Sequence, residues 1–335
     1  MEKKTVRNYA IDCQKGILTL LMLLCHCIQF FGEESRPVQG FLVDYINLTT
    51  FSGFYFCFGY VNYKAYFSKD FTHAVKRMLK NAGKLLIAFY ISEIAFYALF
   101  ENKIFKIDLL GDVLLIRSYA GWSEFLISFA GILILGLLLF PVFKKMRLGI
   151  FALFGAISIA ACFLPYEKQT VPQLALLIGS EKYITYPCVQ YMVYFAFGVL
   201  LSRMEWVFHK FVLLGCGIAS LPVIGFYILK RDLPGRFPPS WIYITGAFLF
   251  IYLYYLLCHW LTARKNMRIA GIVSAYLSEV GANSLFYLLI SNLLIFAFAG
   301  SAFSFRSTLY ATGFYIILLL IIPYLKKLIR HVKLQ

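Results

Sequence analysis

Residues 11–31 read IDCQKGILTLLMLLCHCIQFF, and this stretch sets the structural class of the whole chain. It is mostly apolar over about 20 residues, which is the length that a helix needs to cross the hydrocarbon core of a bilayer. A secretory signal peptide would end in a small-residue cleavage site, but here the chain continues with Gly32 and Glu33. We therefore expect a membrane helix that is retained in the protein.

The composition of the chain is that of a membrane protein. Its 335 residues are 61% hydrophobic and only 14% charged, whereas roughly a quarter of the residues are charged in soluble proteins. The net charge is +16, and among long apolar runs such a basic excess indicates membrane orientation rather than nucleic-acid binding. A soluble two-domain protein, a DNA-binding domain and a disulfide-rich secreted module are therefore excluded.

The eight cysteines indicate neither a disulfide framework nor a metal site. No CxxC pair is present, and most of the cysteines lie in apolar runs, where they are typical small buried side chains. Cys25, His26 and Cys27 are neighbours on one helix and point to different faces, so they cannot converge on one ion. We expect no bound metal.

Apolar runs of spanning or near-spanning length recur along the whole chain, and 148–164 is one of the weaker ones. The ten runs lie near residues 11–31, 41–63, 85–101, 121–143, 148–164, 183–202, 211–229, 241–261, 281–299 and 309–325. The stretch 102–120 is a candidate re-entrant piece. The sequence predicts an all-α transmembrane bundle of about ten helices. We expect it to form a single membrane-embedded domain over residues 1–335, without an appended soluble domain.

The distribution of Lys and Arg predicts the orientation of the bundle. Cytoplasmic loops of membrane proteins are enriched in these two residues. With the N-terminus inside, most of the Lys and Arg residues fall on one side, including Lys3, Lys4 and Lys333 near the chain ends. We therefore expect both termini to be cytoplasmic.

Two connecting segments stand out by composition. The inner segment 64–84 is rich in Lys and Arg, which fits an interfacial helix on anionic lipid headgroups or a surface that binds the phosphates of a cytoplasmic ligand. Both interpretations stay open at this point. The outer segment 230–240, KRDLPGRFPPS, contains three prolines and predicts an ordered, turn-rich cap.

Ionisable residues within the first helix are the clearest functional candidates, because such groups are costly inside a membrane. One helical face carries the stripe Asp12, Lys15, Thr19, Met22, His26 and Gln29. Asp12 can pair with Lys15 one turn later, and His26 lies about 16 Å beyond Lys15 along the helix axis. The stripe must therefore face the bundle interior or a water-filled cavity. His26 is then either a structural histidine or a base that takes a proton from a hydroxyl group.

Further polar residues occur in other expected spans. Asp44, Glu93 and Glu124 could each orient His26 through its second ring nitrogen or form a structural salt bridge. The ninth run opens with GANSLFYLLISNLL (281–294), in which Asn283, Ser284, Tyr287 and Ser291 fall on shared faces. Interhelical hydrogen bonding is the alternative to a functional role for these four residues.

Several stretches, in order along the chain, resemble the acyltransferase-3 family of integral membrane acyltransferases. The family signature is a basic residue, ten residues and a histidine, which here are Lys15 and His26 within IDCQKGILTLLMLLCH. Similar stretches follow at TTFSGFYFCFGYVNYKAYF (49–67), KRMLKNAGKLLIAFY (76–90), YMVYFAFGVLLSR (191–203) and GANSLFYLLISNLL (281–294). The chain departs from the family in having Ser291 where many members have a histidine. It also has a reduced motif, GWSEFL, at 121–126.

The resemblance implies a multi-pass acyltransferase of a bacterial-type cytoplasmic membrane. Its co-substrate would be cytoplasmic acyl-CoA, most often acetyl-CoA. Its acceptor would be a hydroxyl or amine group of a cell-surface glycan or lipid-linked sugar. Membrane lipids and a second copy of the chain are further partners to consider, whereas neither nucleic acid nor a metal is expected.

The resemblance also implies roles for individual residues. His26 would be the general base for the acceptor hydroxyl, or a transient acyl carrier. Lys15 would bind a phosphate or the pantetheine end of acyl-CoA, and Asp12 would hold Lys15 in position. The nucleotide phosphates would contact Arg77, Lys80 and Lys84. The acyl group or the acceptor would occupy a cavity lined by Trp122, Glu93, Asn283, Ser284 and Tyr287.

Two other functions compete with acyl transfer. A flippase or exporter for a lipid-linked sugar or polysaccharide would also need aromatic residues and a polar seam, but it would not bind acyl-CoA. A non-catalytic membrane subunit of a polysaccharide synthase would tolerate the loss of His26. Acyl transfer remains the favoured hypothesis.

Overall fold

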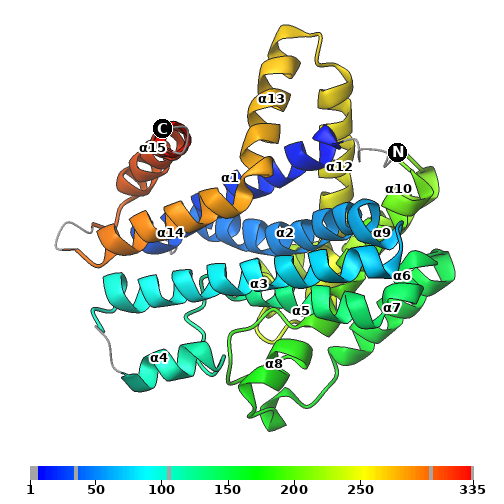
Figure 1. The fold of residues 1–335 in the computed structure, drawn as a ribbon, viewed down its shortest axis with the longest axis horizontal. Helices are drawn as coiled ribbons and strands as arrows, with labels where there is room; N and C mark the ends of the chain where they lie inside the picture. Colours follow the sequence, from blue (N-terminus) through cyan, green and yellow to red (C-terminus); the bar gives the residue numbers. More distant parts are fainter. Residues whose placement is uncertain (1–6, 34–36, 104–106, 302–304, 333–335) are drawn as a thin grey trace.

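The protein is a helical bundle in the computed structural model, which describes residues 7–33, 37–103, 107–301 and 305–332 (Figure 1). No strand occurs within those ranges, so the prediction of an all-α protein is confirmed there. Lys3, Lys4 and Lys333, which contribute to the expected inner charge, lie outside the described residues.

The described segments form fifteen α-helices and three short π- or 3₁₀-helices, which are labelled η. In chain order they are α1 (Tyr9–Phe31), α2 (Pro37–Asn62), η1 (Tyr63–Phe67), α3 (Phe71–Ala95), η2 (Phe96–Phe100), α4 (Ile107–Leu114), α5 (Glu124–Leu138), α6 (Phe140–Lys144), α7 (Leu148–Ala161), η3 (Tyr166–Lys168), α8 (Pro172–Ile178), α9 (Cys188–Met204), α10 (Lys210–Lys230), α11 (Trp241–Gly246), α12 (Phe248–Ala263), α13 (Arg268–Ala282), α14 (Ser284–Ala299) and α15 (Thr308–Val332).

Five described helical segments are long and apolar enough to cross a membrane. They are Tyr9–Phe31, Phe71–Phe100, Lys210–Lys230, Trp241–Ala263 and Thr308–Ile329. The pair α13 and α14 would add a sixth span, although the two helices are bent by 74°. Three more apolar helices, α5, α7 and α9, are shorter. The helix α2 is long but rich in Tyr, Asn and Gly, which lower its hydropathy. Helix length and composition thus support a membrane protein.

Two segments differ from the sequence expectation. The ten expected runs leave residues 262–280 as a connection, but the structure has the helix α13 there, and with α12 it extends beyond the rest of the bundle (Figure 1). Its outer face carries Ile269, Ile272 and Val273 at helical spacing, in a run too short and polar to count as a span. The basic segment 64–84 is not separate from the third expected run at 85–101, because the helix α3 begins within it and continues into that run.

Glycines allow backbone-to-backbone contact between α1 and α13. A Cβ atom added to Gly16 would overlap the carbonyl group of Leu277, and one added to Gly281 would overlap the carbonyl oxygen of Asp12. The helices α2 and α9 make a matching contact at Gly59 and Gly198. Membrane helices use small residues in this way, because close packing replaces the hydrophobic driving force that is absent in lipid.

We predict that Gly281→Ala destabilises the protein, because the added methyl group would push α13 away from α1. Overpacking of this kind costs about 1–3 kcal/mol. The check is the thermal unfolding temperature of the purified protein in detergent, with Gly217→Ala as the control. Gly217 lies in α10 and has no atom near an added Cβ. Equal unfolding temperatures for the two variants would contradict this account of the packing.

Candidate functional site

Three charged side chains form an ion cluster at the first turn of α1. Lys15 Nζ lies 2.7 Å from one carboxylate oxygen of Asp12, and Arg7 Nε lies 2.6 Å from the other. Asn8 caps this helix, because its side-chain oxygen accepts from two backbone N–H groups of the first turn. Arg7 also donates to the carbonyl oxygen of Ser278 on α13, at 3.4 Å. The predicted pairing of Asp12 with Lys15 is confirmed, and Arg7 joins it.

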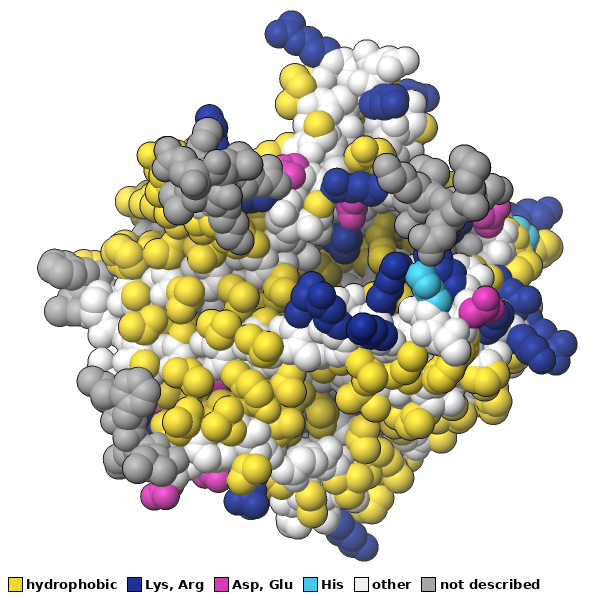
Figure 2. Space-filling view, in the orientation of Figure 1, with side chains coloured by type: hydrophobic (Ala, Val, Ile, Leu, Met, Phe, Trp, Pro, Cys, Tyr) yellow, Lys and Arg dark blue, Asp and Glu magenta, His cyan; other side chains and the backbone are white. Residues whose placement is uncertain are grey.

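A cavity of about 1200 Å³ opens beside the ion cluster, and we call it the mouth. The ends of α1, α2, α12 and α13 form it, and its charged lining residues are Arg7, Asp12, Lys64, Lys265 and Glu279. Figure 2 shows a hollow between the N-terminal part of α1 and α3, with Lys and Arg side chains on both sides of it. The charged lining residues carry three positive and two negative charges, so the mouth has a small positive excess, which favours an anionic ligand.

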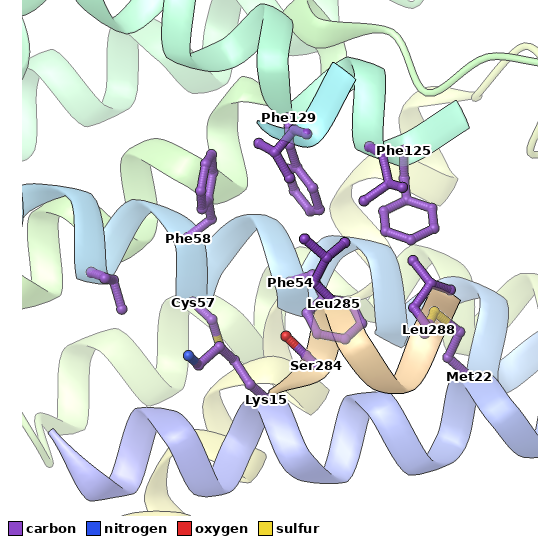
Figure 3. A pocket seen from close by; sticks show the side chains of 13 residues that line it. Lys15, Met22, Phe54, Cys57, Phe58, Phe125, Phe129, Ser284, Leu285 and Leu288 are labelled. Atoms are coloured by element: carbon purple, nitrogen blue, oxygen red, sulfur yellow. The ribbon is translucent and has the colours of Figure 1, made fainter. Parts of the chain in front are cut away.

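A second cavity, of about 170 Å³, lies further along α1, and we call it the inner cavity (Figure 3). The Lys15 side chain lines it, with the ammonium group turned toward Asp12 at the N-terminal end of α1, and Ser284 at the start of α14 lines it as well. The rest of its lining is apolar, with residues such as Phe54, Phe129 and Leu288 from three different helices. Lys15 therefore stands where a charged surface changes to an apolar interior.

His26 is buried, with 6% of its surface exposed, on the same face of α1. Its Nδ1 atom lies 3.1 Å from Oδ1 of Asn292 on α14, and the Asn292 amide nitrogen lies 3.1 Å from the Ser92 hydroxyl on α3. With the Asn292 oxygen as acceptor, Nδ1 carries the hydrogen and Nε2 is left as the basic nitrogen. Trp122 packs edge-on against the imidazole, with the ring centroids 5.4 Å apart. A helix-to-helix hydrogen-bond chain thus orients the ring.

Two buried glutamates hold the turn that carries Trp122. Glu93 accepts from the backbone N–H of Ala120 at 2.9 Å and from the Ser123 hydroxyl at 3.1 Å. Glu124 accepts from backbone N–H groups of the same turn. Neither carboxylate hydrogen-bonds to His26 or forms an ion pair within the described residues, so neither of the two roles left open for Glu93 and Glu124 is found. The glutamates act on the ring through the position of Trp122.

The expected polar seam from Lys15 to His26 is not continuous. The inner cavity extends along α1 as far as Met22, which is one turn before His26. Thr19 is buried on the same face, but its hydroxyl donates to the Lys15 carbonyl oxygen of its own helix. The stripe does face the interior, as predicted, but side chains separate the inner cavity from the imidazole.

The remaining predicted site residues lie apart from His26. Arg77, Lys80 and Lys84 are exposed on one face of α3 and, in the part of the chain that is described, line neither cavity. Asn283 does not line the inner cavity either, since its amide donates to Glu279 beside the mouth. Tyr287 is buried and lines neither of the two cavities. Two predicted residues do lie beside the stripe. Ser284 lines the inner cavity with Lys15, and Trp122 packs on His26.

Sequence reasoning missed Arg7 and Asn292. Arg7 lies just before the helix, pairs with Asp12 five residues later and is also held by the Ser278 carbonyl oxygen of α13. Asn292 follows Ser291, the position at which many members of the resembled family have a histidine. The Ser291 hydroxyl bonds to the Leu288 carbonyl oxygen of its own helix, while Asn292 reaches His26. A polar amide deep in an apolar run was the signal that could have identified it.

Comparisons of the chain with protein-family models, with curated proteins and with solved structures found no match. The site is therefore interpreted from its own geometry.

We predict that Glu93→Leu destabilises the protein by about 2–4 kcal/mol, because it leaves two buried donors of the Trp122 turn without an acceptor. Glu167→Leu is the control, since Glu167 is exposed on η3. Thermal unfolding in detergent measures the difference, and tryptophan fluorescence reports whether the turn has moved. The same unfolding temperature for both variants would show that Glu93 does not support the turn.

Proposed function

We propose that the protein is a transmembrane acyltransferase that moves an acyl group, most simply acetyl, from cytoplasmic acyl-CoA to a hydroxyl group of a cell-surface or lipid-linked glycan. The observation that carries the proposal is the placement of Lys15. Its ammonium group lies between a charged mouth and an apolar inner cavity, on the helix face that ends at an oriented, buried histidine. The resemblance of the first helix to the acyltransferase-3 signature supports the same function.

The mouth suits the phosphate-rich part of acyl-CoA. Arg7, Lys64 and Lys265 supply positive charge around it, and the exposed cations of α3 add to the field that attracts an anion. The proposal gives the protein about ten spans, with both termini and the mouth on the cytoplasmic side of a bacterial-type plasma membrane. All three of these mouth cations lie in segments that the charge distribution assigns to that side.

His26 would act as the general base of the reaction. Its free Nε2 takes the proton of the acceptor hydroxyl while the hydroxyl oxygen attacks the thioester carbonyl carbon. The carbon–sulfur bond then breaks, and the thiolate of coenzyme A leaves and takes the proton from the imidazolium. Asn292 keeps the tautomer in place through Nδ1. Met22 stands between the inner cavity and the ring, and its flexible side chain can be displaced without a change in the backbone.

We predict that His26→Gln abolishes acylation of the glycan and leaves the fold intact, because glutamine can still hydrogen-bond Asn292 but cannot accept the proton. Loss of a general base costs about 10²–10⁴-fold in rate. The measurement is mass spectrometry of surface glycan from cells that carry the wild type or the variant. His209→Gln, at the start of α10, is the control. Unchanged acylation with inserted His26→Gln protein would refute the base assignment and would favour a flippase or a synthase subunit.

We predict that Lys15→Ala weakens binding of acyl-CoA by about tenfold or more, because a hydrogen bond between charged groups is lost. Lys15→Arg should retain most of the affinity, since it keeps the charge beside Asp12. Titration of the purified protein with acetyl-CoA in detergent measures the change, with the exposed Lys230→Ala as control. Equal affinity of Lys15→Ala and wild type would rule out the phosphate-binding role.

A further inference from the structure

The outer side of the bundle contains a second cluster of polar groups that the proposed mechanism does not use. Arg236 lies in the segment 231–240 between α10 and α11, on the side of His26 that faces away from the mouth along α1. Its side chain is half-buried and stacks on Phe237, with 4.4 Å from the guanidinium carbon to the ring centroid. Within the described residues it makes no ion pair and no hydrogen bond.

Two tyrosine hydroxyl groups near Arg236 are buried without a partner. Tyr191 on α9 and Tyr243 on α11 are 1% and 2% exposed, and neither hydroxyl oxygen has a hydrogen-bond partner in the described part of the chain. An unpaired buried hydroxyl costs about 1–3 kcal/mol, and these two belong to a larger group of unpaired buried polar atoms in the described chain, which also includes the Tyr55 hydroxyl. A ligand that accepts or donates hydrogen bonds at this position would give both hydroxyl groups a partner.

These groups converge from several elements. Phe237, on which Arg236 stacks, packs on Tyr186, and Tyr186 packs on Tyr191. Tyr243 lies in α11, which directly follows the segment that carries Arg236. Asp44 and Asp232 are the carboxylates that share this environment, but neither lies within ion-pair distance of the guanidinium. The cationic group is therefore not neutralised by a direct partner.

Aromatic rings form a wall beside the cation. Tyr186 packs on Phe51 at 4.0 Å between ring centroids, on Phe237 at 5.1 Å and on Tyr191 at 5.7 Å. Phe51, Tyr186 and Tyr191 are buried by these contacts, and Phe237 is the partly exposed ring of the group, on which a sugar can pack with its C–H groups. Together the wall, the free guanidinium and the unpaired hydroxyl groups match a sugar that carries an anionic substituent.

We propose that Arg236, with Tyr191 and Tyr243, binds the anionic group of the glycan acceptor, a carboxylate or a phosphate, from the outer side of His26. The planar guanidinium suits both groups, since it can donate two parallel hydrogen bonds to either. The inference rests on the proposed function in treating the bound sugar as the acceptor. It places the donor and the acceptor on opposite sides of the imidazole.

The first test measures the binding of small probes to the purified full-length protein in detergent by ligand-observed NMR titration. The probes are glucuronate, glucose 1-phosphate, inorganic phosphate and glucose. We expect glucuronate or glucose 1-phosphate to bind about tenfold or more tightly than glucose, and the stronger of the two identifies the group. Equal binding of all three sugars, or no binding of either anionic sugar, would overturn the proposal.

Variants then locate the binding. Arg236→Gln should lose the preference for the anionic sugar, whereas Arg231→Gln, an exposed residue of the same segment, should keep it. Tyr243→Phe should weaken sugar binding without lowering the unfolding temperature, because it removes a hydroxyl that has no partner in the unliganded protein. Wild-type affinity in Arg236→Gln would refute the assignment even if that variant folds less well.

A further pair of measurements separates this inference from the proposed function. Arg236→Gln should bind acetyl-CoA as the wild type does, and Lys15→Ala should bind the anionic sugar as the wild type does. If the wild type binds the sugar through Arg236 but does not bind acetyl-CoA, the acyltransferase proposal fails and the anion site stands. If acetyl-CoA binds and the sugar does not, the anion site is refuted and the acyltransferase proposal stands.

Discussion

The close contact between α1 and α13 is the constraint on which the rest of the site depends. Gly16 and Gly281 let the two backbones touch, and a Cβ at either position would meet a carbonyl group of the other helix. This contact brings the Ser278 carbonyl oxygen to Arg7 and so holds the ion cluster on Asp12. It also fixes where α13 ends and α14 begins, because the bend of 74° between these helices comes immediately after Gly281 in the chain.

The bend decides what α14 presents to α1. Since α14 starts at Ser284, its first turn reaches the inner cavity that Lys15 also lines, and its third turn brings Asn292 to His26. A straight continuation of α13 would carry these residues away from α1. The broken helix thus supplies both a cavity-lining hydroxyl and the hydrogen bond that orients the imidazole.

The buried polar groups around His26 and on the outer side differ in whether they have hydrogen-bond partners. Glu93, Glu124, Ser123 and Asn292 satisfy one another or the backbone, so they give a rigid frame around His26. On the outer side the hydroxyl groups of Tyr191 and Tyr243 remain without a partner in the described structure. Among the described residues, unpaired buried groups also occur near the mouth, at Asn62 Oδ1 and His259 Nε2, so it is the nearby guanidinium of Arg236 that sets the Tyr191 and Tyr243 pair apart.

The all-α membrane class, the interior-facing stripe of α1 and the pair of Asp12 with Lys15 followed from the sequence, because each depends only on local helical periodicity and apolar content. The choice of Asn292 as the partner of His26, the attachment of Glu93 to the Trp122 turn and the interruption of the seam at Met22 did not. These features join residues that are distant in the chain. They are decided by where glycines allow helices to approach and where α13 bends into α14, and neither is encoded in the spacing along a single helix.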